Sequence, residues 1–318
     1  MINLQAMNPL PKFLSLGFAL LSLAASALSA APIRVLYFTK SAGYEHSVIK
    51  QVDGKPSYSE VVLSKLAPGH QLEFTYSKDG SKFSPQYLSA FDVVIFYTSG
   101  DLLTEGTDKQ PAMTQEGKQA LLDWVASGKG FMALHAGSDS FHTGEHGGGN
   151  NPNRAQRFKN YGDASDPYVK MLGGEFIKHG PQQVASARVI DPAFPGFGQL
   201  GSEVKVQEEW YSLKEFAADD HVLLVMETKG MEGSDYDRPP YPLAWARLHG
   251  KGRVAYNAMG HREDVWDSTA YQSMLVGMIQ WAAGTVKADV TPNLAKVTPG
   301  HATLPKVPVE KPAADQKK

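Results

Sequence analysis

Short, almost entirely apolar runs alternate with longer stretches of mixed polarity in the first half of the chain. Residues 33–39, 92–99 and 130–135 are such runs, and residues 70–77 form a further β-rich segment. Continuous apolar runs are typical of strands that are buried on both faces of a sheet. A helix is predicted over residues 114–128, between two of them. Strands alternating with helices predict right-handed crossovers, and therefore an α/β fold with a mostly parallel central sheet and helices on both faces.

The second half of the chain carries further strand candidates, separated by glycines. These candidates span residues 184–191, 205–211, 222–228, 243–248 and 253–259. A last helix is predicted over residues 268–283, where apolar side chains recur at helical spacing and indicate packing against the core. The sheet is therefore expected to contain extra strands from the second half.

The N-terminal segment has the layout of a secretory signal peptide. Residues 13–30 are an uncharged apolar run that follows Lys12 and contains an Ala-x-Ala pattern at residues 25–27. This layout predicts a signal peptide over residues 1–30, cleaved within residues 27–31. An uncleaved membrane anchor is the alternative, because the run reaches the lower length limit for spanning a bilayer. We expect a periplasmic or secreted protein that keeps no membrane segment after cleavage.

Composition excludes several classes of function and divides the rest of the chain. The sequence contains no cysteine, which excludes disulfides, thiolate nucleophiles and cysteine-bound zinc. A formal net charge of −2 lacks the basic character of nucleic-acid-binding proteins. We expect one domain over residues 31–284, with a Gly/Asn-rich loop at 143–166. Residues 285–318 are rich in proline and lysine and poor in large apolar side chains, which predicts a disordered tail.

Polar clusters directly follow four of the predicted strands. They span residues 40–46, 135–142, 208–211 and 260–263. Open α/β sheets bind their ligands at the carboxyl ends of the strands. We therefore expect these clusters to meet around one cleft.

The second cluster has the form of a nucleophile elbow, with His135 at the central position. Small residues surround it, as in Ala133-Leu134-His135-Ala136-Gly137, because a sharp turn must push the central side chain out over the sheet edge. An imidazole at this position serves as a general base, a metal ligand or a hydrogen-bond donor. The alternative is a histidine buried against the backbone.

Four segments in this order carry a family resemblance: GFMALHAGSDSFH, MLGGEFIKHG, EEWY and PLAWARLHGKGRVAYNAMGH. Together they resemble the ThuA-like (trehalose utilisation) domain family, and the resemblance runs from about Ile33 to Gly284. It implies a flavodoxin-like fold of the class I glutamine amidotransferase type, and a role in bacterial sugar use. Glutamine amidotransfer itself is excluded, because it needs a thiolate and the chain has none.

The resemblance also points to individual residues: His46, His135, Asp139, His179, Glu209 and His261. We take four of them as candidate catalytic residues, namely His135, Asp139, Glu209 and His261. The candidate binding residues are Tyr44, His46, His142, His179, Trp210 and Tyr211. The loop at residues 143–166 departs from the family pattern and leaves the substrate size and the pocket shape open.

The first functional hypothesis is an enzyme that hydrolyses or eliminates across a glycosidic bond of a small carbohydrate. Asp139 and Glu209 are the candidate carboxylate pair for such a reaction. A variant uses a divalent metal such as zinc, held by His135, His179 and His261. No nucleotide cofactor is expected.

The second hypothesis is a non-catalytic module that binds or senses carbohydrate in the same pocket, since fold alone does not fix function. Aromatic side chains that stack on sugar rings would serve it. The candidates are Trp210, Tyr211, Trp245 and Trp266. The sequence leaves the substrate, the bond, the metal and the oligomeric state open.

Overall fold

The computed structural model describes residues 31–143 and 154–307, together with Met1. The predicted signal peptide and residues 144–153 of the predicted loop lie outside the described residues. Within the described residues, no helix has both the length and the apolar character needed to cross a membrane.

A nine-stranded mixed sheet forms the centre of the described domain. Its strands, in sheet order, are β2 (Leu72–Ser77), β1 (Ile33–Phe38), β3 (Val93–Phe96), β4 (Gly130–Leu134), β11 (Gly252–Asn257), β10 (Tyr241–His249), β9 (His221–Met226), β6 (Gln183–Val189) and β7 (Glu203–Glu208). The strands from β2 to β11 in this order are parallel, and those from β10 to β7 are added antiparallel. Two further strands, β5 (Glu175–His179) and β8 (Tyr211–Lys214), pair separately. The α/β fold predicted from the sequence is confirmed, including its extra strands.

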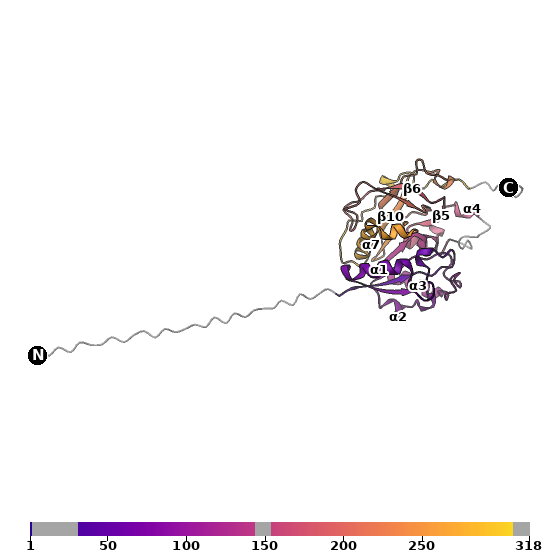
Figure 1. Ribbon diagram of the computed structural model, residues 1–318. Coiled ribbons are helices and arrows are strands. Elements are labelled where there is room, and N and C mark those ends of the chain that lie inside the picture. The colour runs from indigo at the N-terminus through magenta and orange to yellow at the C-terminus, as the bar shows by residue number, and fades with distance from the viewer. Residues whose placement is uncertain (2–30, 144–153, 308–318) are drawn as a thin grey trace. The chain divides into compact units, whose positions relative to one another are not determined.

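Helices cover both faces of the sheet. One group consists of α1 (Tyr58–Leu66), α6 (Glu263–Asp267) and α7 (Thr269–Ala282), which contact one another in series. The other consists of α2 (Pro85–Leu88), α3 (Gln115–Ala126) and α5 (Pro167–Leu172). Right-handed crossovers from β1 to β2 and from β3 to β4 place α1 and α3 on opposite faces. Figure 1 shows α1 and α2 on either side of the indigo strands.

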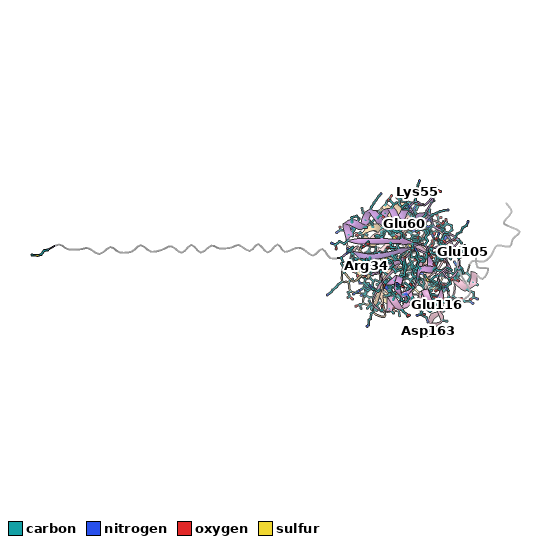
Figure 2. All side chains as sticks on the ribbon, turned by 90° about the horizontal axis from the view of Figure 1, so that it is seen from below. Arg34, Lys55, Glu60, Glu105, Glu116 and Asp163 are labelled. Atoms are coloured by element: carbon teal, nitrogen blue, oxygen red, sulfur yellow. The ribbon has the colours of Figure 1, made fainter. Side chains whose placement is uncertain are left out.

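The two edges of the parallel strands differ in character. At the amino ends, the exposed Arg34 pairs with Asp92 at 2.8 Å. Glu105 lies in the loop that follows β3, at the carboxyl ends. Figure 2 shows Arg34 and Glu105 on opposite sides of the domain. The polar clusters expected from the sequence follow strands at the carboxyl-end edge, on the side of Glu105.

Two strands differ from the sequence prediction. The single strand predicted over residues 205–211 is two strands, β7 and β8, which belong to different sheets. The break falls at Glu209 and Trp210, because the Trp210 ring is fully buried and its indole N–H donates to the Gln183 carbonyl at 2.9 Å. Strand β5 has no predicted counterpart, since charged residues interrupt its short apolar run.

The C-terminal segment is ordered over residues 285–307, so the prediction of a disordered tail over 285–318 is wrong for this part. It contains α8 (Leu294–Val297), and Leu294 is buried against Val222 and Val225 of β9. The Asn293 side chain accepts from Val222 N at 2.7 Å and donates to Val222 O at 3.2 Å. Average composition concealed these few anchoring side chains. Residues 308–318 lie outside the described part.

The predicted loop at 143–166 is partly helical where the structure describes it. It contains α4 (Arg154–Arg157) and a 3-10 turn at Gly162–Ala164. The Arg157 guanidinium lies 3.5 Å from the Asp139 carboxylate, so this segment lies beside the turn after β4.

Candidate functional site

The turn after β4 has the sharp geometry that its sequence predicts. His135 has φ +40°, a left-handed conformation that is uncommon for a residue with a side chain, and it opens a 3-10 turn over His135–Asp139. A Cβ at Gly137 would lie 2.7 Å from the Ala133 Cβ, so the turn requires glycine there. Unlike the side chain of an exposed nucleophile, the His135 ring is fully buried, and its centroid lies 4.0 Å from that of Tyr211.

Three imidazoles and one carboxylate converge beside this turn. They belong to His46, His135, Glu209 and His261, whose ligand atoms all lie within 4.8 Å of one another. Glu209 Oε2 lies 3.5 Å from His135 Nε2 and 3.1 Å from His261 Nδ1. The four residues follow β1, β4, β7 and β11, and we call them the histidine nest.

Each imidazole of the nest uses its outer nitrogen for a hydrogen bond. His135 Nδ1 lies 2.8 Å from the Ala258 carbonyl, His46 Nε2 lies 3.4 Å from the Tyr211 hydroxyl, and His261 Nε2 lies 2.9 Å from the Gln182 amide.

The inner ring nitrogens of the nest have no hydrogen-bond partner among the described residues. These buried atoms are His46 Nδ1, His135 Nε2 and His261 Nδ1. Because the Ala258 carbonyl can only accept, the proton of a neutral His135 ring sits on Nδ1, which leaves a lone pair on Nε2 facing Glu209. This lone pair and the carboxylate repel each other unless a proton or a metal ion lies between them.

Burial and mutual charge interactions shift the pKa values of three residues in the nest. Burial lowers the pKa of His46 well below its usual value, and the neighbouring imidazoles of His135 and His261 lower it further. Burial alone would raise the pKa of the Glu209 carboxyl, but His135 and His261 outweigh it and hold that pKa well below its usual range. Burial opposes protonation of His261, yet Glu209 raises the pKa of that imidazole.

Glu208 links the two segments that carry Glu209 and His261, although no functional role was predicted for it. Its carboxylate accepts from the backbone N–H groups of Glu209 at 2.7 Å, Gly260 at 2.8 Å and His261 at 3.2 Å. These bonds join the end of β7 to the loop after β11. Burial raises the pKa of Glu208 itself. The sequence feature that could have marked Glu208 is the pair of adjacent glutamates in EEWY, of which only Glu209 faces the nest.

A cleft of ≈ 510 Å³ opens over the nest. Its lining residues are Tyr44, His46, Asp139, Arg157, Phe158, Phe176, Ile177, Lys178, His179, Gln182, Glu209, Tyr211 and His261. His179 Nδ1 lies 3.4 Å from Glu209 Oε1, the oxygen that faces away from His135. The nest contains His135 and His261 of the predicted metal set together with His46, whereas His179 lies at its edge.

The donor set of the nest fits a divalent transition metal. Imidazole nitrogen and carboxylate oxygen are the ligands that zinc takes where no thiolate is present. Two ligands at zinc distance in a tetrahedral site lie roughly 3.3–3.4 Å apart. The contacts of Glu209 with His135 and His261, at 3.5 and 3.1 Å, match this spacing. The hydrogen bond from His135 Nδ1 to the Ala258 carbonyl is of the kind that orients metal-binding histidines.

Most, but not all, of the candidate residues meet at this cleft. Trp210 does not reach it, and Trp245 and Trp266 are also fully buried, with indole N–H groups that donate to backbone carbonyls. The prediction that these tryptophans stack on sugar is therefore wrong. Of the four aromatic side chains named as stacking candidates, only Tyr211 lines the cleft. His142 lies behind Asp139, 2.6 Å from that carboxylate, and does not line the cleft.

Sequence reasoning missed several lining residues, among them Arg157, Phe158, Phe176 and Gln182. Phe176 belongs to the GGEF segment, whose position in the resemblance was a usable signal. Arg157 and Phe158 come from the predicted loop, which had no pattern to mark them.

The sequence matches the ThuA family, described as trehalose utilisation, over residues 34–159 and 145–282. No curated protein matches it significantly. A ThuA-like protein of Bacteroides uniformis is similar in structure, with a TM-score of 0.57, 19% identity, and coverage of 81% of this chain and 94% of that one. A ThuA-like protein of Parabacteroides merdae has a TM-score of 0.55, 17% identity, and coverage of 87% and 98%. At these identities the likeness concerns the fold alone.

Proposed function

This chain belongs to the ThuA (trehalose utilisation) family, and from that premise we propose that it acts on a small sugar or glycoside in the cleft above the histidine nest. The reaction is hydrolysis or elimination across a glycosidic bond. The observation that carries the proposal is the set of three buried imidazole nitrogens around Glu209 at the floor of the cleft, which have no hydrogen-bond partner in the part of the chain that the structure describes. The absence of cysteine leaves imidazole and carboxylate groups to supply the chemistry.

The nest is proposed to hold one divalent metal of the zinc class through His46, His135, Glu209 and His261. When bound, such an ion polarises a ligand oxygen as a Lewis acid. Glu209 is then a metal ligand rather than one half of a hydrolase carboxylate pair. Asp139 remains the acid–base candidate of the cleft, with His179 beside Glu209 as a second titratable group.

Zinc binding is the first expected result. Metal-free protein should take up one equivalent of Zn²⁺, measured by elemental analysis after gel filtration. At a free concentration of 100 times Kd the metal should stabilise the fold by about 2.7 kcal/mol. For a domain of this size that raises the midpoint of thermal unfolding by about 5–10 °C. Uptake of no metal, or an unchanged midpoint, would contradict the metal site.

Sugar recognition is supported by the mixed lining of the cleft. Phe176 and Tyr211 offer apolar faces, with ring centroids 4.1 Å apart, and Tyr44 lies at the rim with 67% of its surface exposed. Asp139 and Gln182 add polar groups that exchange hydrogen bonds with hydroxyls. Small-molecule sites usually combine mostly apolar walls with a small number of precisely placed polar groups.

Tyr44→Ala should weaken binding of trehalose, used as the probe, by roughly 2- to 10-fold, since an aromatic contact contributes about 0.5–1.5 kcal/mol. The thermal midpoint should not change, because most of the Tyr44 side chain is in solvent. Tyr58→Ala is the matched control, a tyrosine at the surface that does not line the cleft. Equal trehalose affinity in wild type and Tyr44→Ala would exclude Tyr44 from the site.

Turnover tests the proposed reaction. A panel of disaccharides and glycosides that includes trehalose is incubated with zinc-loaded and with chelator-treated protein, and the products are separated by chromatography. We expect cleavage that is lost with the chelator and restored by zinc. Binding without cleavage would favour the alternative, a carbohydrate-binding or sensing module, which the aromatic lining also suits. Neither binding nor cleavage would contradict both functions.

Export is also proposed, on the strength of the signal-peptide layout over residues 1–30. Expression of the full chain in a Gram-negative host should place it in the periplasm, about 30 residues shorter at its N-terminus, by fractionation and mass spectrometry.

A further inference from the structure

A second buried group of charges lies behind the cleft, apart from the histidine nest. The His142 ring is fully enclosed between two carboxylates, with Nε2 2.6 Å from Asp139 Oδ1 and Nδ1 2.7 Å from Glu175 Oε1. Lys214 Nζ lies 3.3 Å from Glu175 Oε2, and Arg157 lies 3.5 Å from Asp139 Oδ1. Among these residues only Asp139 and Arg157 line the cleft.

Both contacts of His142 require a proton. An ionised carboxylate accepts hydrogen bonds and does not donate them, so two carboxylates are satisfied by one imidazole only when both ring nitrogens carry hydrogen. Glu175 is held in its ionised form by Lys214 and by the Thr143 N–H, which lies 3.4 Å from Oε1. The cavity beside Glu175 measures only ≈ 10 Å³, too little for more than one water molecule. The charges are therefore balanced by protein groups.

The arrangement fixes one oxygen of Asp139 and leaves the other for the cleft. Oδ1 faces His142 and Arg157, whereas Oδ2 has no hydrogen-bond partner within residues 31–143 and 155–307. We propose that His142, held as an imidazolium by Glu175, is a positioning residue that fixes the Asp139 carboxylate through Oδ1 and presents its Oδ2 to a ligand hydroxyl in the cleft. The ligand part of this inference rests on the proposed function, but the charge state of His142 does not.

The pKa directions agree with the geometry. Burial lowers the pKa of His142, but Asp139 and Glu175 outweigh it and raise that pKa above its usual value. Burial raises the pKa of Glu175, but His142 and Lys214 outweigh it and lower that pKa. A raised His pKa means that the ion pairs of His142 stabilise the fold fully below about pH 6.5 and lose this effect only as the pH rises through the raised pKa.

Nitrogen-detected NMR of protein labelled with ¹⁵N-histidine tests the charge state directly. The chain has ten histidines, so a His142→Gln variant identifies the His142 signals. We expect protons on both ring nitrogens near neutral pH in the wild type, with or without a chelator. In Glu175→Gln, one of the two should be lost. Asp191→Asn is the matched control, because it alters a separate histidine–carboxylate pair, His221 with Asp191 at 3.0 Å, and should leave His142 unchanged.

A single protonated nitrogen on His142 in the wild type would overturn the inference, since it would place the second proton on a carboxyl group. The ligand part is tested with trehalose as the probe. Asp139→Asn and His142→Gln should each weaken trehalose binding by about tenfold or more, because a hydrogen bond to a charged group contributes that much. Unchanged affinity in both variants would also overturn it. If the wild type does not bind trehalose, that result counts against the proposed function, and the NMR measurement decides this inference alone.

Discussion

Replacing Glu209 with glutamine should reduce the affinity of the metal-free protein for Zn²⁺ by more than about 100-fold. Changes to the groups behind metal ligands already cost about 10- to 100-fold, so removal of an anionic ligand should cost at least as much. Glu209 is the only carboxylate of the nest, and Oε2 lies within 3.5 Å of two of its imidazoles. The substitution keeps the side-chain shape, so the loss should come from the charge and not from a cavity.

The affinity is measured by competition with a chromophoric chelator. Glu263→Gln is the matched control, because Glu263 is an exposed carboxylate two residues from His261 that bonds to Ser47 at 2.7 Å and lies outside the nest. It removes the same charge from the same neighbourhood and should leave the affinity within about twofold, as expected for screened surface charges. Zinc affinity that survives Glu209→Gln would refute the nest as the metal site. An equal loss of zinc affinity in Glu263→Gln would show that the affinity depends on the negative charge of the region and not on Glu209 as a ligand.

The sequence predicted that the polar clusters meet around one cleft, but it did not predict the direction of the strand that brings Glu209 there. Buried strands followed by polar residues placed His135 and His261 at one edge of the sheet, because carboxyl ends of parallel strands share an edge. Glu209 follows an antiparallel strand, yet β7 runs in the same direction as β4 because four antiparallel pairings, an even number, separate it from β11. The direction of β7 depends on how many antiparallel strands come before it in the sheet, and no local sequence pattern predicts that number.

The choice between His46 and His179 shows the limit more sharply. His46 follows β1, His179 is the last residue of β5, and both line the cleft. Only the side-chain directions separate them: His46 is buried with its ring centroid 4.9 Å from that of His135, whereas the His179 side chain is 41% exposed and hydrogen-bonds to the Gly180 carbonyl. The depth at which each ring is buried depends on packing, and sequence spacing does not report it.

The prediction that Trp210 lies in the pocket was wrong for a related reason. Trp210 stands beside Glu209 in the sequence and was expected in the pocket, but neighbouring residues of an extended chain point to opposite sides. Glu209 faces the nest, so Trp210 faces the core, where the Tyr236 hydroxyl donates to its carbonyl at 2.6 Å. The period of two that predicts strands also predicts this separation.

Deletion of residues 285–318 should lower the midpoint of thermal unfolding by roughly 6–12 °C, from a loss of about 3 kcal/mol or more. Composition alone suggests no effect, since a disordered tail stabilises nothing. The structure gives a different expectation because Leu294 is 2% exposed in the protein. Burial of a leucine side chain contributes about 1.5–3 kcal/mol.

The hydrogen bonds of this segment add to that loss because they satisfy buried groups. Strand β6 pairs with β9 only over Leu224–Met226, so the backbone of Val222 lacks a strand partner on that side, and the Asn293 side chain takes its place at 2.7 and 3.2 Å. The buried Arg238 donates to the carbonyl of His301 at 2.9 Å. A buried polar group left unpaired costs about 1–3 kcal/mol.

Two variants separate these contributions from a general effect of shortening. A deletion after Val307 keeps all of these contacts and should leave the midpoint unchanged, whereas Asn293→Ala in the full chain should reproduce part of the loss. Arg238 also donates to Ser212 and to the Leu213 carbonyl, at 3.0 and 2.6 Å, next to Tyr211 of the cleft. The longer deletion should therefore loosen β8 and weaken trehalose binding as well. If it changes neither the midpoint nor the affinity, residues 285–307 do not anchor β9 and β8.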